Sequence, residues 1–250
     1  MSVKDAGRRS VAGGLSAAAL AVAILVAASG AAAQPAPAGL SARIDALSAE
    51  VDRLEGARAV RKLQRAFGYY MDRGLWDEAA DLFTDTGTVE IGMDGVYVGK
   101  ARILDYLQRL GGGHHGMVYG QLDEWLQLQP VVDVAADGLT AKGRWRDLGM
   151  IGKFGKSAAW RDGIYENDYV KEGGVWKIRA LHLYVNFITP YEKGWSRLQP
   201  VTGDWSSDVA KAFPPDRPPT ANYKPFPDLQ LPPFHYANPV TGKRFAGAKP

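Results

Sequence analysis

The spacing of apolar residues divides the chain into a helical part followed by a strand-rich part. Between residues 40 and 72 apolar positions recur every three or four residues, which predicts one long amphipathic helix, or two abutting helices, that Gly74 ends. Two shorter helical patterns cover residues 75–83 and 99–110. Short extended segments at 88–91 and 96–98 lie between those two patterns.

The period changes from 3.6 to 2 after the glycine loop at 111–113. Alternation of this kind predicts four long strands, near 116–129, 139–150, 157–170 and 175–188. Turn-forming residues between these segments fit hairpins, so the strands are expected to form an antiparallel sheet. Helices followed by a strongly curved sheet predict an α+β fold, a cone-shaped barrel in which the sheet wraps around the N-terminal helices.

The first 33 residues have the pattern of an export signal. Three cations at Lys4, Arg8 and Arg9 precede an uncharged apolar run at 11–28, and the small residues at 31–33 suit a signal peptidase. The apolar run is shorter than the roughly 20 residues that a membrane span needs, so cleavage is favoured over an uncleaved anchor. We therefore expect a periplasmic or secreted protein with no membrane attachment after cleavage, and the paired arginines are compatible with the twin-arginine route.

Composition divides the rest of the chain into three parts. Residues 34–54 are a Pro/Ala spacer and an amphipathic helix whose apolar stripe predicts a homodimer or homotrimer. Residues 55–195 form the folded domain. The tail, 196–250, contains 11 of the 15 prolines and many aromatic residues, so we expect it to lie on the domain or on a neighbouring subunit.

Charge and cysteine content exclude several function classes. Removing residues 1–33 takes away three cations and one anion, so the formal charge falls from +3 to +1, and no basic cluster remains to bind nucleic acid. The chain has no cysteine, which excludes disulfides and thiol nucleophiles. The four histidines do not have the spacing of metal ligands, and no phosphate-cradling glycine loop is present, so we expect neither a metal nor a cofactor.

Three motifs in the middle of the chain resemble a known family. They are YYMDRGLWDEAADLF at 69–83, the helix start Gly99-Lys100 and GGVWKI at 173–178. In this order and spacing they resemble the SnoaL-like branch of the nuclear-transport-factor-two superfamily, over about residues 55–195. The resemblance implies a cone-shaped α+β barrel. It also implies enzymes such as scytalone dehydratase, ketosteroid isomerases, limonene epoxide hydrolases and lyases that remove formaldehyde from diarylpropanes, which mostly need no cofactor.

The resemblance and the residue types together select candidate catalytic groups. Asp72 matches a pocket aspartate of scytalone dehydratase, and a carboxylate at a helix C-terminus opposes the helix dipole, although an exposed turn aspartate fits the same pattern. His114 and His115 lie where that family member has its catalytic histidine, and on a strand only one of two neighbours can face inward. Tyr69 and Tyr70 precede Asp72, and one of them is expected to point into the cone as a substrate contact or as core packing.

The later strands supply the remaining candidates. Counting by two from Trp176 predicts that His182, Tyr184 and Asn186 face the pocket, where His182 is either catalytic or a core histidine. Arg144 and Arg146 share one strand face. On the next strand Glu166 and Asp162 share a face, opposite Tyr165. An inward Arg–Glu pair would support the barrel or orient a substrate hydroxyl. The Ser and Asn that scytalone dehydratase uses correspond by spacing to Gly163 and Tyr165, which puts the same substrate in doubt.

These observations predict a cofactor-independent lyase that dehydrates or deformylates a hydroxylated aromatic or polycyclic small molecule. A histidine would remove a proton, and Asp72 or a tyrosine would protonate the leaving oxygen. An isomerase that uses the same base is the near alternative. A non-catalytic periplasmic protein that binds a small molecule is the alternative from a different class.

Overall fold

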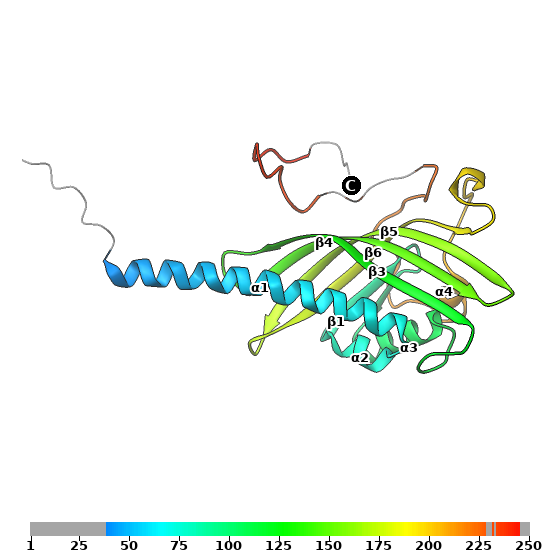
Figure 1. The fold of residues 1–250 in the computed structure, drawn as a ribbon, viewed down its shortest axis with the longest axis horizontal. Helices are drawn as coiled ribbons and strands as arrows, with labels where there is room; N and C mark the ends of the chain where they lie inside the picture. Colours follow the sequence, from blue (N-terminus) through cyan, green and yellow to red (C-terminus); the bar gives the residue numbers. More distant parts are fainter. Residues whose placement is uncertain (1–38, 229–231, 233, 246–250) are drawn as a thin grey trace, which may run out of the picture.

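A computed structural model describes residues 39–228, 232 and 234–245, and it confirms the α+β fold (Figure 1). The elements in chain order are α1 (Leu40–Asp72), α2 (Trp76–Asp81), β1 (Phe83–Ile91), β2 (Val96–Val98), α3 (Lys100–Leu110), β3 (Gln121–Val134), β4 (Thr140–Lys153), β5 (Ser157–Glu172), β6 (Val175–Pro190), the 3-10 turn η1 (Trp195–Arg197) and α4 (Asp208–Ala212). The expected export signal lies outside the described residues. None of the helices within the described ranges is long and apolar enough to span a membrane.

The six strands form one open sheet in the order β2-β1-β6-β5-β4-β3. The four long strands pair in antiparallel fashion, as their alternation predicts. The sheet as a whole is mixed rather than antiparallel, because β1 runs parallel to its neighbour β6. This pairing extends the sheet by β1 and β2. The local sequence could not reveal it, since it joins β1 to β6, which is far away in the chain. Helices α1, α2 and α3 lie on one face of the sheet (Figure 1).

The core lies between those helices and the inner face of the sheet. Gly56, Val60, Gln64, Phe67 and Met71 form the buried face of α1 at helical spacing. Opposite them, aromatic side chains from β3, β4 and β5 are buried: Trp125, Trp145, Tyr165 and Tyr169. Alternation along each strand therefore separates an aromatic inner face from a more charged outer face.

Two β-bulges in β6 change which side chains face the core. The pairing with β5 shifts register between Asp168 and Tyr169 and again between Asp162 and Gly163. Ile178 is buried on the inner face, and because of the bulge the next buried residue along β6 is Leu181 rather than Ala180. The expectation that His182 shares a face with Trp176 is wrong for this reason.

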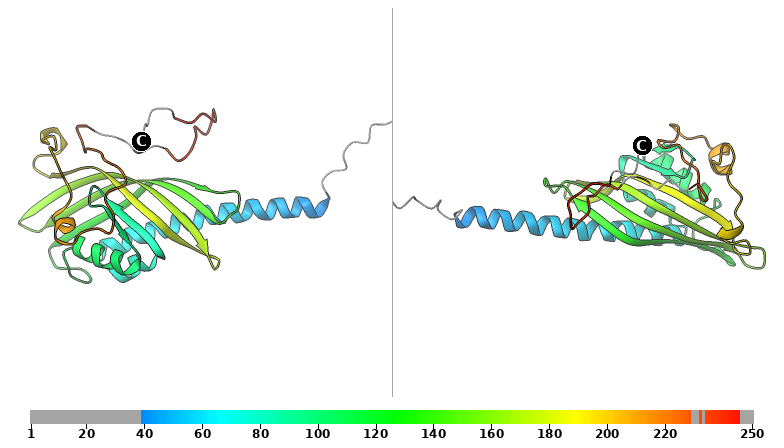
Figure 2. Two further views of the ribbon diagram at one scale, coloured as in Figure 1. Left: turned by 180° about the vertical axis from the view of Figure 1, so that it is seen from behind. Right: turned by 90° about the horizontal axis from the view of Figure 1, so that it is seen from above.

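The tail crosses the outer face of the sheet (Figures 1 and 2). Thr220 donates from its backbone N–H (2.8 Å) and its hydroxyl (2.7 Å) to the buried carboxylate of Glu90 on β1. The hydroxyl of Tyr223 accepts a bond from the N–H of Val185 on β6 (2.8 Å). These bonds satisfy buried polar groups, so the part of the tail around Thr220 and Tyr223 is fixed to the sheet.

Candidate active site

Asp72 is the last residue of α1, and its side chain is held by the sheet. Its Oδ1 accepts a hydrogen bond from the backbone N–H of Trp125 on β3 at 2.6 Å. Burial raises the pKa of the Asp72 carboxyl to about 6, and the nearby charges of Glu124 and Asp123 act in the same direction. A carboxyl with this pKa exchanges its proton near neutrality, which suits a general acid or base.

His114 lies in a glycine-rich loop between α3 and β3. Trp76 Nε1 donates to the carbonyl of His114 at 2.5 Å and anchors the loop to α2. His114 Nδ1 is 3.0 Å from the carbonyl oxygen of Gly116. A carbonyl can only accept, so Nδ1 carries a proton, and in the neutral imidazole Nε2 then has the free lone pair. This Nε2 atom is buried without a hydrogen-bond partner.

Both residues line a small cavity beneath the glycine-rich loop at 111–120. Asp72, His114, Trp76 and Asp123 are among its lining residues, and its volume is about 30 Å³. This is room for a single water molecule. His115 instead has an exposed side chain, 3.8 Å from Asp77 at the surface. The structure thus brings His114, and not His115, to Asp72.

Asp123 is a site residue that sequence reasoning missed. Its Oδ1 accepts a bond from Trp125 Nε1 at 2.8 Å. Burial raises the pKa of the Asp123 carboxyl, the charge of Arg161 opposes that rise, and His114 is near enough to contribute. The signal was present in the sequence, because counting by two from the apolar Trp125 puts Asp123 on the same face.

A buried ion pair supports this end of the cone. Arg161 on β5 binds Asp147 on β4 through two hydrogen bonds, of 2.6 Å and 3.2 Å. The guanidinium also lies 3.6 Å from the centre of the Trp125 ring. Tyr165, a predicted substrate contact, is buried beside the pair, with a hydrogen bond to Asp147. Its role in this position is to support the site from within the core.

The wider part of the cone is filled by hydrogen-bonded side chains. Gln64 on α1 donates to Gln127 on β3 (2.8 Å), and its Oε1 accepts from Asn167 (3.0 Å) and Tyr169 (2.7 Å) on β5. Trp145 Nε1 donates to the Tyr169 hydroxyl at 3.0 Å. The space that a cone could offer to a ligand is thus occupied by a satisfied polar network.

The two tyrosines before Asp72 point in different directions. Tyr70 packs against the core, so it follows the packing alternative. Tyr69 is 67% exposed and lines a surface groove of about 350 Å³ between α1 and β3, which Asp72 also borders. Asp72 therefore lies between this groove and the internal cavity.

The other predicted site residues lie on the outer face of the sheet, not in the cone. They are Arg144, Arg146, Glu166, His182, Tyr184 and Asn186, and they pair with one another, with Asp162 on β5 or with the tail. The expected Arg–Glu pair does form, between Arg144 and Glu166, but it is buried under the tail rather than inside the barrel. Burial lowers the pKa of His182 to about 3, so its imidazole is neutral although Glu90 Oε1 is 3.5 Å away.

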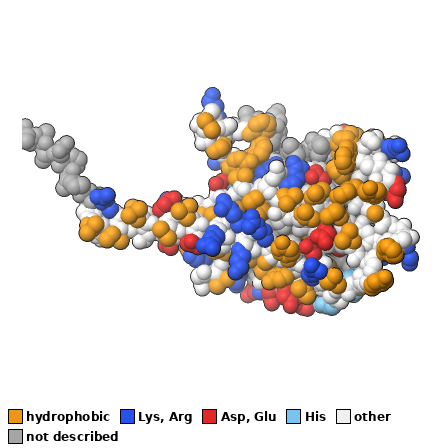
Figure 3. All heavy atoms as spheres, viewed as in Figure 1, with side chains coloured by type: hydrophobic (Ala, Val, Ile, Leu, Met, Phe, Trp, Pro, Cys, Tyr) orange, Lys and Arg blue, Asp and Glu red, His pale blue; other side chains and the backbone are white. Residues whose placement is uncertain are grey.

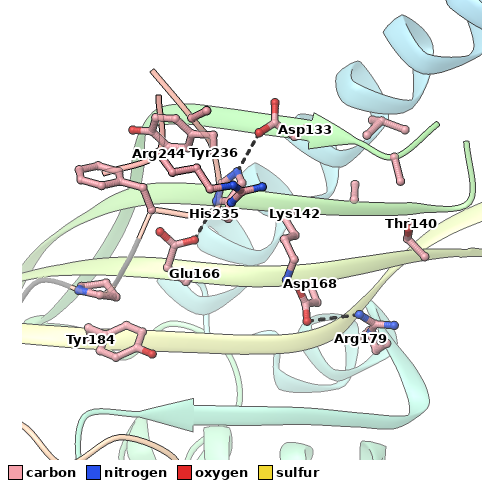
Figure 4. A pocket seen from close by; sticks show the side chains of 16 residues that line it. Asp133, Thr140, Lys142, Glu166, Asp168, Arg179, Tyr184, His235, Tyr236 and Arg244 are labelled. Carbon is pink, nitrogen blue, oxygen red and sulfur yellow. Dashed lines mark hydrogen bonds and ion pairs between the residues drawn. The ribbon is translucent and has the colours of Figure 1, made fainter. Parts of the chain in front are cut away.

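A cavity of about 880 Å³ separates the tail from this outer face (Figure 4). His235 from the tail points to two carboxylates, with Nδ1 2.9 Å from Glu166 and Nε2 3.4 Å from Asp133. Lys142, Arg179 and Arg244 add cations, and Tyr184, Phe234 and Tyr236 add aromatic surface. Among the residues that the structure describes, no cluster of three or more histidines and carboxylates could hold a metal ion.

Comparison with known proteins identifies the fold family. The model of the SnoaL-like domain matches residues 52–182, more than half of the chain. The chain belongs to the SnoaL-like domain family. A comparison with curated proteins found no match.

The chain is also similar to several solved structures at low sequence identity. The crystal structure of LinA is 19% identical with a TM-score of 0.50, covering 57% of this chain and 93% of that chain. A LinA-type3 hexachlorocyclohexane dehydrochlorinase from Novosphingobium barchaimii LL02 has 20% identity and a TM-score of 0.49 over 56% of this chain and 93% of that one. A candidate scytalone dehydratase from Novosphingobium aromaticivorans DSM 12444 has 20% identity and a TM-score of 0.48. The match covers 55% of this chain and 89% of that chain.

Proposed function

We propose that this SnoaL-like protein is a cofactor-independent lyase whose acid/base pair is His114 and Asp72. The observation that supports the proposal is the shared cavity, in which the buried, unpartnered Nε2 of His114 and the carboxyl of Asp72 line one small space. With a pKa of about 6, roughly a tenth of the Asp72 carboxyls are protonated at pH 7. A protonated Asp72 carboxyl is therefore available near neutrality as the acid.

In a dehydration, His114 Nε2 removes a proton from the carbon next to the one that bears the hydroxyl group. The electrons of the C–H bond form the new double bond while the C–O bond breaks, and Asp72 protonates the oxygen, which leaves as water. The product state holds an imidazolium beside the carboxylates of Asp72 and Asp123, which stabilise it. Transfer of the proton from His114 back to Asp72 restores both groups.

Deformylation needs the same two groups. His114 would take the proton of a primary hydroxyl, the adjacent C–C bond would break to release formaldehyde, and the freed electron pair would expel an oxygen that Asp72 protonates. An isomerase would use the same base and return the proton to another carbon. The mass of the product separates the three reactions, since it falls by one water, by formaldehyde and water, or not at all.

Access to the site requires the glycine-rich loop at 111–120 to open. The cavity holds about one water, whereas small-molecule pockets have roughly 300–1,000 Å³. His114 belongs to this loop and Asp72 to α1, so closing the loop over a substrate would assemble the pair. The aromatic rings of Trp76 and Trp125 beside the site favour a flat, aromatic or polycyclic substrate.

The neighbouring histidines provide a matched test. Hydroxylated aromatic compounds are screened by thermal shift, and products of those that bind are analysed by mass spectrometry. His114→Ala and Asp72→Asn should each lower the rate by about 10²–10⁴, the usual loss for a removed acid or base, while His115→Ala should keep it. Equal rates for the two histidine variants on a substrate that the wild type converts would refute the assignment.

The outer cavity favours a second candidate function, the binding of a small aromatic anion. Its size is within the range of ligand pockets. Lys142 and Arg179 share the carboxylate of Asp168, whereas Arg244 forms no ion pair with any described residue and lines the cavity together with the rings of Phe234 and Tyr236. Thermal shift with aromatic carboxylates tests it, using Arg244→Gln and Lys142→Gln as variants. Shifts that both variants reduce and His114→Ala preserves would support this site, and shifts unchanged in both variants would exclude it.

A further inference from the structure

The beginning of α1 projects beyond the folded domain (Figure 1). Residues 40–55 are exposed apart from the half-buried Arg53, and the first buried residue is Gly56, whose Cα packs against the Trp176 ring. At about 1.5 Å per residue this segment is roughly 24 Å long. The helix thus extends well past the surface that it packs against.

The projecting segment carries one continuous apolar stripe. Leu40, Ile44, Leu47, Val51 and Leu54 are 75%, 52%, 67%, 56% and 63% exposed. Figure 3 shows apolar side chains along this part of the helix. Their spacing of four and three is that of a heptad with Ile44 and Val51 at position a and leucines at d. The next a position is Arg58, so the stripe ends where the domain begins.

The residue types indicate what covers this stripe. Residues 40–55 contain four acidic and two basic residues, a net charge of −2, which disfavours an anionic membrane surface. An apolar stripe at a and d positions is the surface that a second helix covers in a coiled coil. A second copy of this helix therefore fits the stripe better than a lipid surface does.

We propose that two copies of the chain associate through residues 40–54 as an antiparallel two-stranded coiled coil. In this register Ile44 packs against Leu47 of the second copy, and Leu40 packs against Val51 of the second copy. Each contact occurs twice because of the two-fold symmetry. The folded domains then lie at opposite ends of the helix pair, which leaves both glycine-rich loops accessible.

The charged residues that flank the stripe select this direction. In a parallel pair, Glu50 at position g would face Glu55 of the second copy at e, so two like-charge contacts would form. In the antiparallel register the g positions face each other, and Arg43 faces Glu50 of the second copy, so two opposite-charge contacts form. Within the described part of one chain Glu50 pairs with the half-buried Arg53 one turn away, a weak contact that it can exchange.

Light scattering over a roughly hundredfold range of concentration tests the association. The wild type should pass from monomer to dimer, and Leu47→Asp should remain a monomer. At concentrations where the wild type is also monomeric, the two should have the same melting temperature, because that side chain is exposed in the single chain. A wild type that stays monomeric over the whole range, or that forms trimers, would overturn the proposal.

Charge reversal tests the direction. Glu50→Arg should weaken the dimer severalfold in the antiparallel register, and adding Arg43→Glu should restore it. In a parallel pair Glu50→Arg would instead strengthen the dimer by removing the repulsion from Glu55. A tighter dimer for the single variant therefore refutes the antiparallel arrangement.

The absence of natural cysteines allows an independent test by disulfide trapping. Under mild oxidation a mixture of Ile44→Cys and Leu47→Cys chains should form the crosslinked heterodimer. Neither variant should crosslink efficiently by itself, because in this register each cysteine faces an unchanged residue. Efficient self-crosslinking of either single variant would show a parallel pair and overturn the proposal.

Discussion

Loss of the buried Asp147–Arg161 pair should destabilise the domain more than loss of any surface ion pair. The Asp147 side chain is fully buried, and that of Arg161 is 5% exposed. Asp147→Ala leaves the guanidinium of Arg161 buried without its anion. Breaking a buried pair in this way costs about 3–5 kcal/mol, which corresponds to a fall of roughly 6–20 °C in melting temperature for a chain of this size.

The neighbouring residue on β4 provides a matched control. Arg146 is 38% exposed and binds Asp162 at 3.2 Å on the outer face, so Arg146→Ala should cost less than about 1 kcal/mol. Replacing both members of the buried pair, as Asp147→Leu with Arg161→Met, should recover more than half of the loss, since an apolar pair pays no desolvation cost. In each variant that lacks the Asp147 carboxylate, Tyr165 loses its hydrogen bond to that group but still accepts one from Gln127 (3.4 Å).

The measurement is thermal unfolding followed by circular dichroism, together with urea unfolding for the free energies. A fall of less than about 2 °C for Asp147→Ala would show that water reaches the pair, and the reasoning from burial would be refuted. A double variant less stable than the single one would show instead that the pair itself, and not the stranded charge, stabilises the fold.

Four further predictions follow from the site and the sequence. Asp72→Asn should be more stable than the wild type at pH 8 and no more stable at pH 4. The pKa of Asp72 is about 6 in the folded chain and 3.8 in the unfolded chain, so the wild type loses stability as the pH rises between these values. Melting curves at both pH values test this. His182→Gln should lose less stability than the wild type between pH 7 and pH 5. The folded wild type, with a His182 pKa of about 3, stays neutral there, whereas the unfolded histidine takes up a proton below about 6.5. Melting curves over this pH range test the prediction, and turnover should be unchanged. Activity should survive EDTA, and restoration by zinc after its loss would contradict the cofactor-independent mechanism. Mass spectrometry of the exported protein should find an N-terminus near residue 34, and an intact Met1 would contradict cleavage.

The elements of the fold were predictable because their patterns are local. The helix at 40–72 and the four long strands follow from apolar periods of 3.6 and 2 that few glycines or prolines interrupt. The parallel pairing of β1 with β6 was not predictable in the same way. It joins strands far apart in sequence, and the alternation within each strand carries no information about its partner.

The candidate site was only partly predictable, for a geometric reason. Alternation assigns faces correctly until a bulge adds a residue, and two bulges lie in β6, on either side of His182. Strand alternation does not apply to Asp72, which ends α1, or to His114, which lies in the loop between α3 and β3. The family resemblance, rather than strand counting, had selected both. The outer cavity depends on where the tail docks, which its rings alone do not specify.

The arrangement of polar groups inside the cone also restricts which molecules the proposed pair can convert. The bonds among Gln64, Asn167 and Tyr169 leave no donor or acceptor of this network unpaired for a ligand, so opening it would cost several buried hydrogen bonds. The loop at 111–120 has glycines at positive φ and an exposed tip, so it yields more easily than the network. Under the proposed mechanism a substrate would therefore enter from the loop with its reacting carbon foremost, and the rest of the molecule would remain near Met117 and Tyr119. Compounds with the hydroxyl at one end of a flat ring system should react, and isomers with the same hydroxyl flanked by rings on both sides should not. Equal rates for such a pair of isomers would show that the network opens and that the whole cone is available to the substrate.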